Sequence, residues 1–239
     1  MAVSIDRVYQ KVLALANKEQ RGYITPQEFN LFAHQAQMEI FEQYFYDINQ
    51  FGRSSGNDTE YSDMLSLINE KLSVLKGYHT TSVLFEATSG AAIINLANLP
   101  NDLYKIGTIF SNGVEVEEVQ VNELLNINKS PLTRPTESRP IYTNMSREPG
   151  YGLEFYPNTI SSINMTYIKK PSNPNWNYVV VNDKALYNSS SSTHFELHSS
   201  EESELVYRIL IFAGIAIKKP QLSQMVGGLA AAQIQQEKQ

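Results

Sequence analysis

Two histidines, His194 and His198, are the residues whose types and spacing come nearest to a metal site. They lie four positions apart in "HFELH", and on a helix such a pair shares one face, as two zinc ligands require. Phe195 and Leu197 alternate with the polar residues, however, which indicates an extended segment in which four residues span about 13 Å. The order also differs from the H-E-x-x-H motif of zinc proteases. The spacing therefore predicts no metal ion shared by these histidines.

The stretch "NKEQRGYITPQEF", residues 17–29, matches half of a calcium-binding loop. Gly22 falls on the sharp-turn position and Glu28 on the position of the bidentate ligand. Arg21 falls where an oxygen ligand is needed, and a guanidinium group cannot bind a cation. A calcium-regulated protein with a degenerate loop is therefore kept only as a third hypothesis for function.

A helical hairpin accounts for the same residues. Apolar residues at helical spacing predict a helix from Ile5 to Glu19, followed by a turn and a second helix. Thr25 is suited to cap that second helix, Pro26 to occupy its first position, and Glu28 to complete a capping box.

Motifs for other chemistry are missing from the sequence. The chain has no cysteine, which excludes thiol nucleophiles, disulfides and Cys-based zinc sites. "GYGLEF", starting at Gly150, lacks the third glycine of a dinucleotide fingerprint, and there is no P-loop or G-x-S-x-G elbow. A hydrolase with two distant carboxylates leaves no local mark and stays a weak alternative. We expect a protein that is not an enzyme and uses no cofactor or metal.

Length and charge restrict the class of protein further. A chain of 239 residues is long enough for one or two domains with a real core, and its formal charge of −6 argues against a sequence-independent grip on nucleic-acid phosphates. The longest apolar run, "ILIFAGIAI", has nine residues, fewer than a membrane span needs, and the N-terminus does not have the pattern of a signal peptide. We expect a soluble protein that is cytosolic when made.

The hydrophobic pattern predicts an α+β fold: a helical bundle from the N- and C-terminal helices, plus a β-rich middle region with long loops. Residues 1–78 are predicted to form three helices and 79–198 the β-rich region. In that region Asn112-Gly113 predicts a hairpin, and 126–149, which contains four prolines, is predicted to be an extended loop. Residues 199–239 are predicted to form C-terminal helices that pack with the N-terminal ones.

Signals for the start and the end of a helix are clearest in this C-terminal part. Ser199 is suited to cap a helix, with Glu202 returning the capping-box hydrogen bond. Apolar residues then cover more than one face until Lys218 and Lys219, and Pro220 stops the helix.

The run "INMTYIKKPSNPNWNYVVV", with "THFELHSSEESELVYRILIFAGIAIKKP" after it, resembles proteins of tailed bacteriophages. Similar features are a strand that ends in Lys-Lys-Pro, a short Pro-x-Trp link, and an acidic-capped apolar helix. The opening "VYQKVLALANKEQRGYITPQEFNLFAHQAQMEIFEQYF" fits the same group. This group is the head-to-tail connectors, that is, the portal-attached ring or tail-adaptor proteins of short-tailed phages, including crAss-like phages.

This resemblance implies a virion structural protein at the head-tail junction, present in the host cytoplasm during assembly. It implies a homo-oligomeric ring, commonly a dodecamer, whose partners are the portal and neighbouring tail or ring proteins. DNA would pass through its lumen during ejection without sequence-specific binding, and no membrane is involved. Expected interface residues are Arg134, Arg139, Arg147, Met225, Leu229 and Ile234. Better-known adaptors grip the portal with a long C-terminal helix or tail, which Gly227-Gly228 interrupts here.

The alternative hypothesis is a carbohydrate- or receptor-binding tail component. A β-rich middle region and fourteen tyrosines are compatible with it, and Trp176 is the single tryptophan available as a sugar-binding platform.

Overall fold

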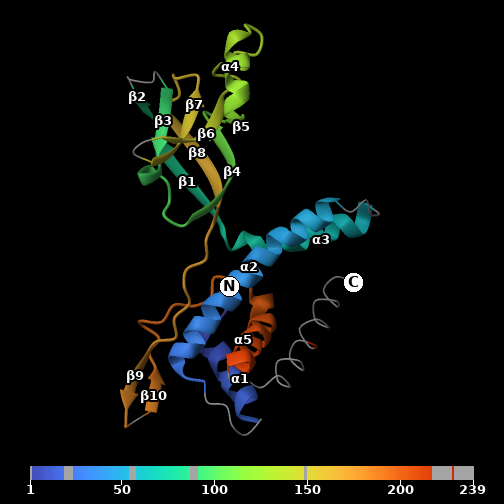
Figure 1. Ribbon diagram of the computed structural model, residues 1–239, viewed down its shortest axis with the longest axis vertical. Coiled ribbons are helices and arrows are strands. Elements are labelled where there is room, and N and C mark those ends of the chain that lie inside the picture. The colour runs from blue at the N-terminus through green and yellow to red at the C-terminus, as the bar shows by residue number, and fades with distance from the viewer. Residues whose placement is uncertain are drawn as a thin grey trace. The chain divides into compact units, whose positions relative to one another are not determined.

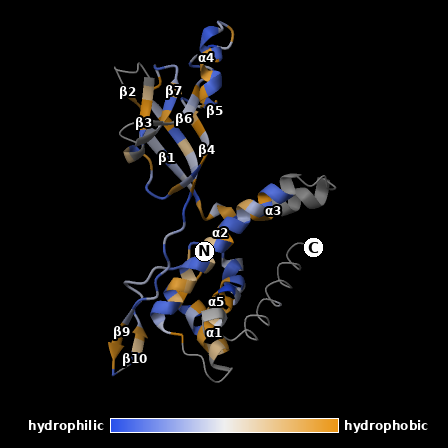
Figure 2. Ribbon diagram, viewed as in Figure 1, coloured by the Kyte–Doolittle hydropathy of each residue, from blue (hydrophilic) through white to orange (hydrophobic). Residues whose placement is uncertain are grey.

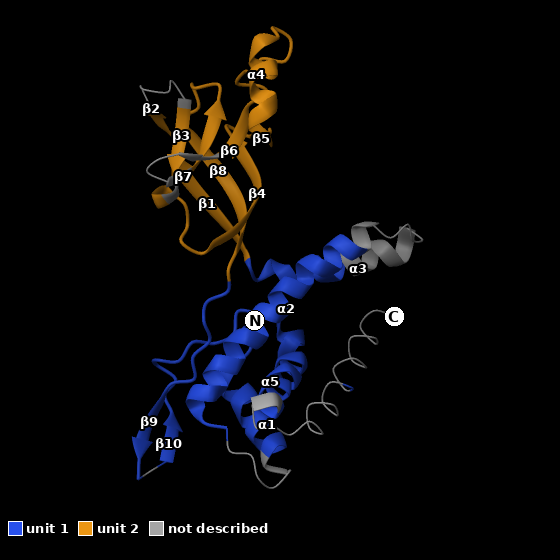
Figure 3. Cartoon of the chain, viewed as in Figure 1, with its two compact units in different colours: residues 1–75, 171–239 blue, residues 76–170 orange. Residues whose placement is uncertain are grey.

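The computed structural model describes residues 2–18, 24–53, 58–86, 91–147, 150–182, 184–216 and 228. It confirms the α+β class, with helices towards both termini and strands in the middle (Figure 1). The chain forms two compact units: residues 1–75 with 171–239, called here the helical unit, and residues 76–170, called the sheet unit (Figure 3). No helix within the described ranges is long and apolar enough to cross a lipid bilayer.

The helical unit is built from both ends of the chain. α5 lies against α1 and α2, and their facing side chains form a core that includes Val8, Phe29, Ile40 and Ile209. The elements of this unit are α1 (Ile5–Lys18), α2 (Pro26–Arg53), α3 (Asp58–Ser73), β9 (Tyr178–Val181), β10 (Lys184–Tyr187), the short 3-10 helix η2 (Ser199–Glu201) and α5 (Glu202–Ala216).

Local signals set the start of α2 as predicted. The Thr25 hydroxyl accepts a hydrogen bond from the Glu28 amide at 3.3 Å, and the Glu28 carboxylate accepts one from the Thr25 amide at 2.9 Å, which is a complete capping box. Hydrogen bonds that the Thr25 amide and the Thr25 hydroxyl donate to the Glu28 carboxylate lower the pKa of Glu28. The predicted turn at Arg21-Gly22 lies outside the described residues.

The start of α5 differs from the prediction. Ser199 does not cap an α-helix but begins η2, and the residue before it, His198, accepts a hydrogen bond from the Ser200 amide. Glu201 is only 1% exposed, and its carboxylate forms an ion pair with Lys71 of α3 at 2.8 Å. Glu201 is thus buried with a partner from a distant part of the chain. Local capping signals in the sequence carry no information about such a partner.

Residues 171–198 fold with the helices, whereas the sequence assigned them to the β-rich region. Gln37 of α2 is fully buried; its amide donates to the Ser172 carbonyl at 2.7 Å and accepts from the Glu196 amide at 3.1 Å. The Glu196 carboxylate in turn accepts from the Ser172 amide at 3.0 Å. Phe195, fully buried, pairs with Val3 in a β-bridge. These contacts join the segment to α1 and α2.

The sheet unit contains one curled sheet of eight strands in the order β1-β8-β4-β5-β6-β7-β3-β2 (Figure 1). The only parallel pair in this order is β5 with β6. Its elements are β1 (Lys76–Ser82), β2 (Leu84–Glu86), β3 (Ala91–Asn95), the 3-10 helix η1 (Leu96–Asn98), β4 (Leu103–Ser111), β5 (Val114–Glu118), α4 (Val121–Lys129), β6 (Ile141–Arg147), β7 (Gly150–Tyr156) and β8 (Ser162–Lys169).

The first and the last strand in this order, β1 and β2, are consecutive in the chain, so the sheet curls back towards its own start. β1 and β2 are separated only by Val83, whose side chain belongs to the core enclosed by the sheet. Leu153, Phe155 and Met165 are fully buried in the same core. The strong curvature is supported at Gly152, where a Cβ atom would lie 2.9 Å from the Ile94 carbonyl oxygen of the paired strand.

The Asn112-Gly113 hairpin is confirmed. Both residues have positive φ, 49° and 82°, as a type I′ turn requires, and Ser111 pairs with Val114 across it. β5 then ends at Glu118.

The predicted loop 126–149 is much shorter than expected. α4 runs to Lys129 and β6 begins at Ile141, so residues 130–140 alone form an irregular arm in this region. α4 is only about two and a half turns long. β6 is held by a hairpin with β7 and, at its first two residues, by parallel pairing with β5 on the far side of α4 in the sequence.

Two ion pairs of the helical unit differ in burial, so removing one partner of each should change the free energy of unfolding by very different amounts. Lys71→Met leaves the Glu201 carboxylate buried without its cation, so we expect a loss of roughly 3 kcal/mol or more in the free energy of unfolding. Lys11→Met is the matched control, because Lys11 is half exposed where it pairs with Glu202 at 2.6 Å, and less than about 1 kcal/mol is expected. Urea unfolding at neutral pH measures both, and equal losses would contradict the prediction.

Candidate interaction surfaces

Trp176 anchors a two-stranded hairpin, residues 178–187 in β9 and β10, to the helical unit. Its side chain is 2% exposed, and its Nε1 donates to Asp6 of α1 at 3.0 Å. Its backbone amide donates to the Asn30 side chain of α2 at 2.8 Å. The indole stacks on Tyr178 and Tyr187, one from each strand, with centroid distances of 5.7 and 5.8 Å. The base of the hairpin is therefore held rigidly by both helices.

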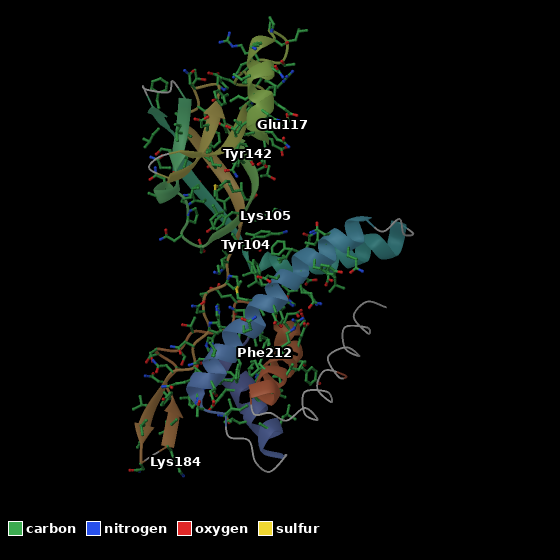
Figure 4. All side chains as sticks on the ribbon, viewed as in Figure 1. Tyr104, Lys105, Glu117, Tyr142, Lys184 and Phe212 are labelled. Atoms are coloured by element: carbon green, nitrogen blue, oxygen red, sulfur yellow. The ribbon has the colours of Figure 1, made fainter. Side chains whose placement is uncertain are left out.

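The rest of this hairpin exposes aliphatic side chains on both faces. Val179, Val180, Val181 and Leu186 are between 46% and 61% exposed (Figure 2). Within the described ranges β9 and β10 pair with each other and with no further strand. Figure 4 places Lys184 at the far end of the hairpin. A hairpin of two strands is marginally stable alone, and exposed aliphatic side chains gathered on one projection are typical of a surface that another protein covers.

A second projecting feature is the arm, residues 130–140, which follows α4 in the sheet unit. α4 extends away from the sheet (Figure 1), with Leu125 67% exposed, and Leu132 in the arm is 88% exposed. Leu124, the preceding residue of α4, is buried. The sheet unit therefore carries two exposed leucines, Leu125 and Leu132, on one projecting segment.

Backbone hydrogen bonds fix the shape of the arm. The amides of Thr133 and Arg134 both donate to the Ser130 carbonyl, at 3.3 and 3.0 Å, and Thr136 pairs with Arg139 in a tight bridge. Pro135 and Pro140 are buried, which holds the arm against the unit at two points. Because the backbone of the arm is already ordered, binding a partner costs little further backbone entropy.

An open groove lies beside β5, where the sheet is least continuous. β5 pairs with β4 only at residues 114–116 and with β6 only at Glu117 and Glu118. On β4 a bulge at Gly107 and Thr108 interrupts the pairing with β8. There the Thr166 hydroxyl accepts a hydrogen bond from the Thr108 amide at 2.9 Å. The groove has a volume of about 490 Å³. Figure 4 shows Glu117 and Tyr142, two of its lining residues, close together.

The groove has an acidic lining next to the core of the sheet unit. Ile109, Val116 and Tyr142 border it but are at most 5% exposed, because they belong to that core. Glu115, Glu117 and Glu118 line its sides and are exposed. None of these three carboxylates forms an ion pair with another residue that the structure describes.

The predicted interface residues are only partly described. Arg134 and Arg139 lie on the arm and are exposed, and neither side chain pairs with a carboxylate among the described residues. Arg147 ends β6, and its side chain lies outside the description. The three tail residues also lie outside the described residues: Met225, Leu229 and Ile234.

The histidine pair lies in an extended segment, as the alternation of Phe195 and Leu197 predicts. The His194 ring accepts a hydrogen bond from the Ile5 amide at 3.3 Å, and His198 lies beyond two buried residues, Phe195 and Leu197, in an extended segment. The described part of the chain holds no cluster of three or more residues that could bind a metal ion. Trp176, buried as described above, is not available as a platform for a sugar ring.

Two carboxyl groups of α5 differ in their titration. Burial raises the pKa of Glu204, although Arg208, which bonds it from the next turn and also pairs with Glu39 at 3.2 Å, opposes the shift. Partial burial acts in the same direction on Glu202, but hydrogen bonds and charge from Lys11 and Arg7 prevail and lower its pKa. The ion pairs of these groups join α1, α2 and α5, so they stabilise the helical unit.

No protein-family model matches the sequence, and comparison with curated proteins finds no relative.

The stacking around Trp176 predicts how the hairpin is held. Tyr187→Ala removes one aromatic pair, and at about 1 kcal/mol for such a pair we expect the β9 and β10 amides to exchange hydrogen about fivefold faster. Leu186→Ala, at the neighbouring position on the other face of β10, is the control and should change exchange less than about twofold. Hydrogen exchange followed by mass spectrometry measures both; the same rate in the two variants would contradict the anchor.

Proposed function

We propose that this protein is a non-enzymatic structural subunit of a phage head-to-tail connector ring that attaches below the portal and extends the DNA channel. The observation that carries the proposal is the hairpin, in which aliphatic side chains stay exposed on a projection whose base is fixed to the helical unit. Such a feature has a clear use in a subunit that is covered on assembly.

Further support comes from the sequence and its charge. The resemblance to connector proteins covers the segments that build the helical unit, including the link that contains Trp176. A formal charge of −6 suits a channel through which DNA slides without adhering. Two different exposed surfaces, the hairpin in the helical unit and the arm in the sheet unit, suit a subunit with more than one neighbour.

The decisive experiment combines the purified chain with assembled portal rings from the same genome. We expect negative-stain images to show an additional ring on the portal, and light scattering to show a mass increase by several copies of the chain. A chain that never joins assembled portals contradicts the proposal, even when it is well folded.

A charged residue in the hairpin should block assembly without unfolding the chain. Val180→Asp places a carboxylate on a side chain that is 61% exposed, so we expect an unchanged midpoint of thermal unfolding but at least about tenfold weaker incorporation into rings. Leu31→Asp on α2, 68% exposed, is the matched control and should assemble normally. Equal incorporation of both variants would show that the hairpin is not at an interface.

A further inference from the structure

The sheet unit carries two groups of exposed side chains with opposite charge. Arg134 and Arg139 are exposed on the arm, and the carboxylates Glu115, Glu117 and Glu118 are exposed along the groove. Neither set forms an ion pair with any residue that the structure describes. The two surfaces belong to the same unit and are complementary in charge, yet they do not neutralise each other within one chain.

The arm also carries an exposed apolar side chain. Leu132 is 88% exposed and lies two positions before Arg134. Gly107 and Thr108 line the groove, whose volume of about 490 Å³ leaves room for a leucine side chain. Paired charges along the groove would give such a contact its orientation.

We propose that the arm of one copy docks into the β5 groove of the next copy, with Leu132 beside Thr108 and with Arg134 and Arg139 against Glu115, Glu117 and Glu118. The contact joins two different patches, so it is heterologous and repeats from copy to copy, as a closed ring requires. This inference rests on the proposed function and identifies one of the surfaces by which the ring is built.

Cross-linking tests the contact directly, because the natural chain has no cysteine. Leu132→Cys chains mixed with Thr108→Cys chains should give a covalent dimer of one copy of each with a short bismaleimide, whereas each variant alone should give none. The double variant should give a ladder of higher oligomers. Leu132→Cys mixed with Thr80→Cys, an exposed threonine on β1, is the control and should not cross-link.

Charge reversal tests the ionic part of the contact. Arg134→Glu and Glu117→Lys should each weaken self-association about tenfold at low salt, and mixing the two variants should restore it to within about threefold of the natural chain. Lys105→Glu on β4 and Glu70→Lys on α3 change charge equally outside the contact and should leave association within about twofold. Raising the ionic strength should reduce the difference between the natural and reversed chains.

The outcomes separate this contact from the proposed function. Rings that form on portals without a Leu132 to Thr108 cross-link, or with both reversed variants incorporated normally, overturn the arm contact and leave the connector role intact. A chain that stays monomeric alone and on portals overturns the connector role and the arm contact together. Cross-linked heterodimers with restoration by the mixed charge variants support both.

Discussion

The fold depends on the buried amide of Gln37, which holds the returning chain against α2. The helical unit is split in the sequence by the whole sheet unit, so its two parts must be joined after residues 76–170 have been made. Gln37 binds both Ser172 and Glu196, which in turn bind each other, and no member of this set is left without a partner. Because a buried amide is costly unless paired, the arrangement permits essentially one position for the returning segment.

Fixing that segment also fixes the surface that we propose to be covered on assembly. Trp176 lies between Ser172 and the hairpin, and its contacts with Asp6 and Asn30 bind it to α1 and α2. The exposed valines of β9 thus project from a rigid base, although β9 and β10 pair with no other strand that the structure describes. In the sheet unit the arm follows the same principle, since its backbone is ordered locally while Leu132 and Arg134 remain exposed. Both surfaces are preorganised, which lowers the entropic cost of binding.

Prediction from the sequence succeeded where the information was local. The capping box at Thr25 and Glu28, the turn at Asn112-Gly113 and the apolar stripes of α1 and α2 all involve residues within a few positions of one another. It was wrong where a distant partner decided. Glu201 is drawn into the interior by Lys71, so α5 is preceded by a 3-10 turn instead of a cap at Ser199. The first residues of β6 pair with β5, from which α4 and the arm separate them in the sequence, in a region without a clear pattern of its own.

The arginines of the arm could be selected from the sequence as candidates because they stand in a proline-rich segment with little periodicity. The groove that we propose as their partner could not, because it arises from a bulge opposite Thr166 and from the short parallel joint between β5 and β6. By itself the sequence determined the class of fold, the local helix and turn signals, and the absence of thiol chemistry, since these follow from composition and short-range periodicity. Tertiary structure alone decided which strands are neighbours, which charges are buried in pairs and which remain free, because these depend on contacts between residues far apart in the chain.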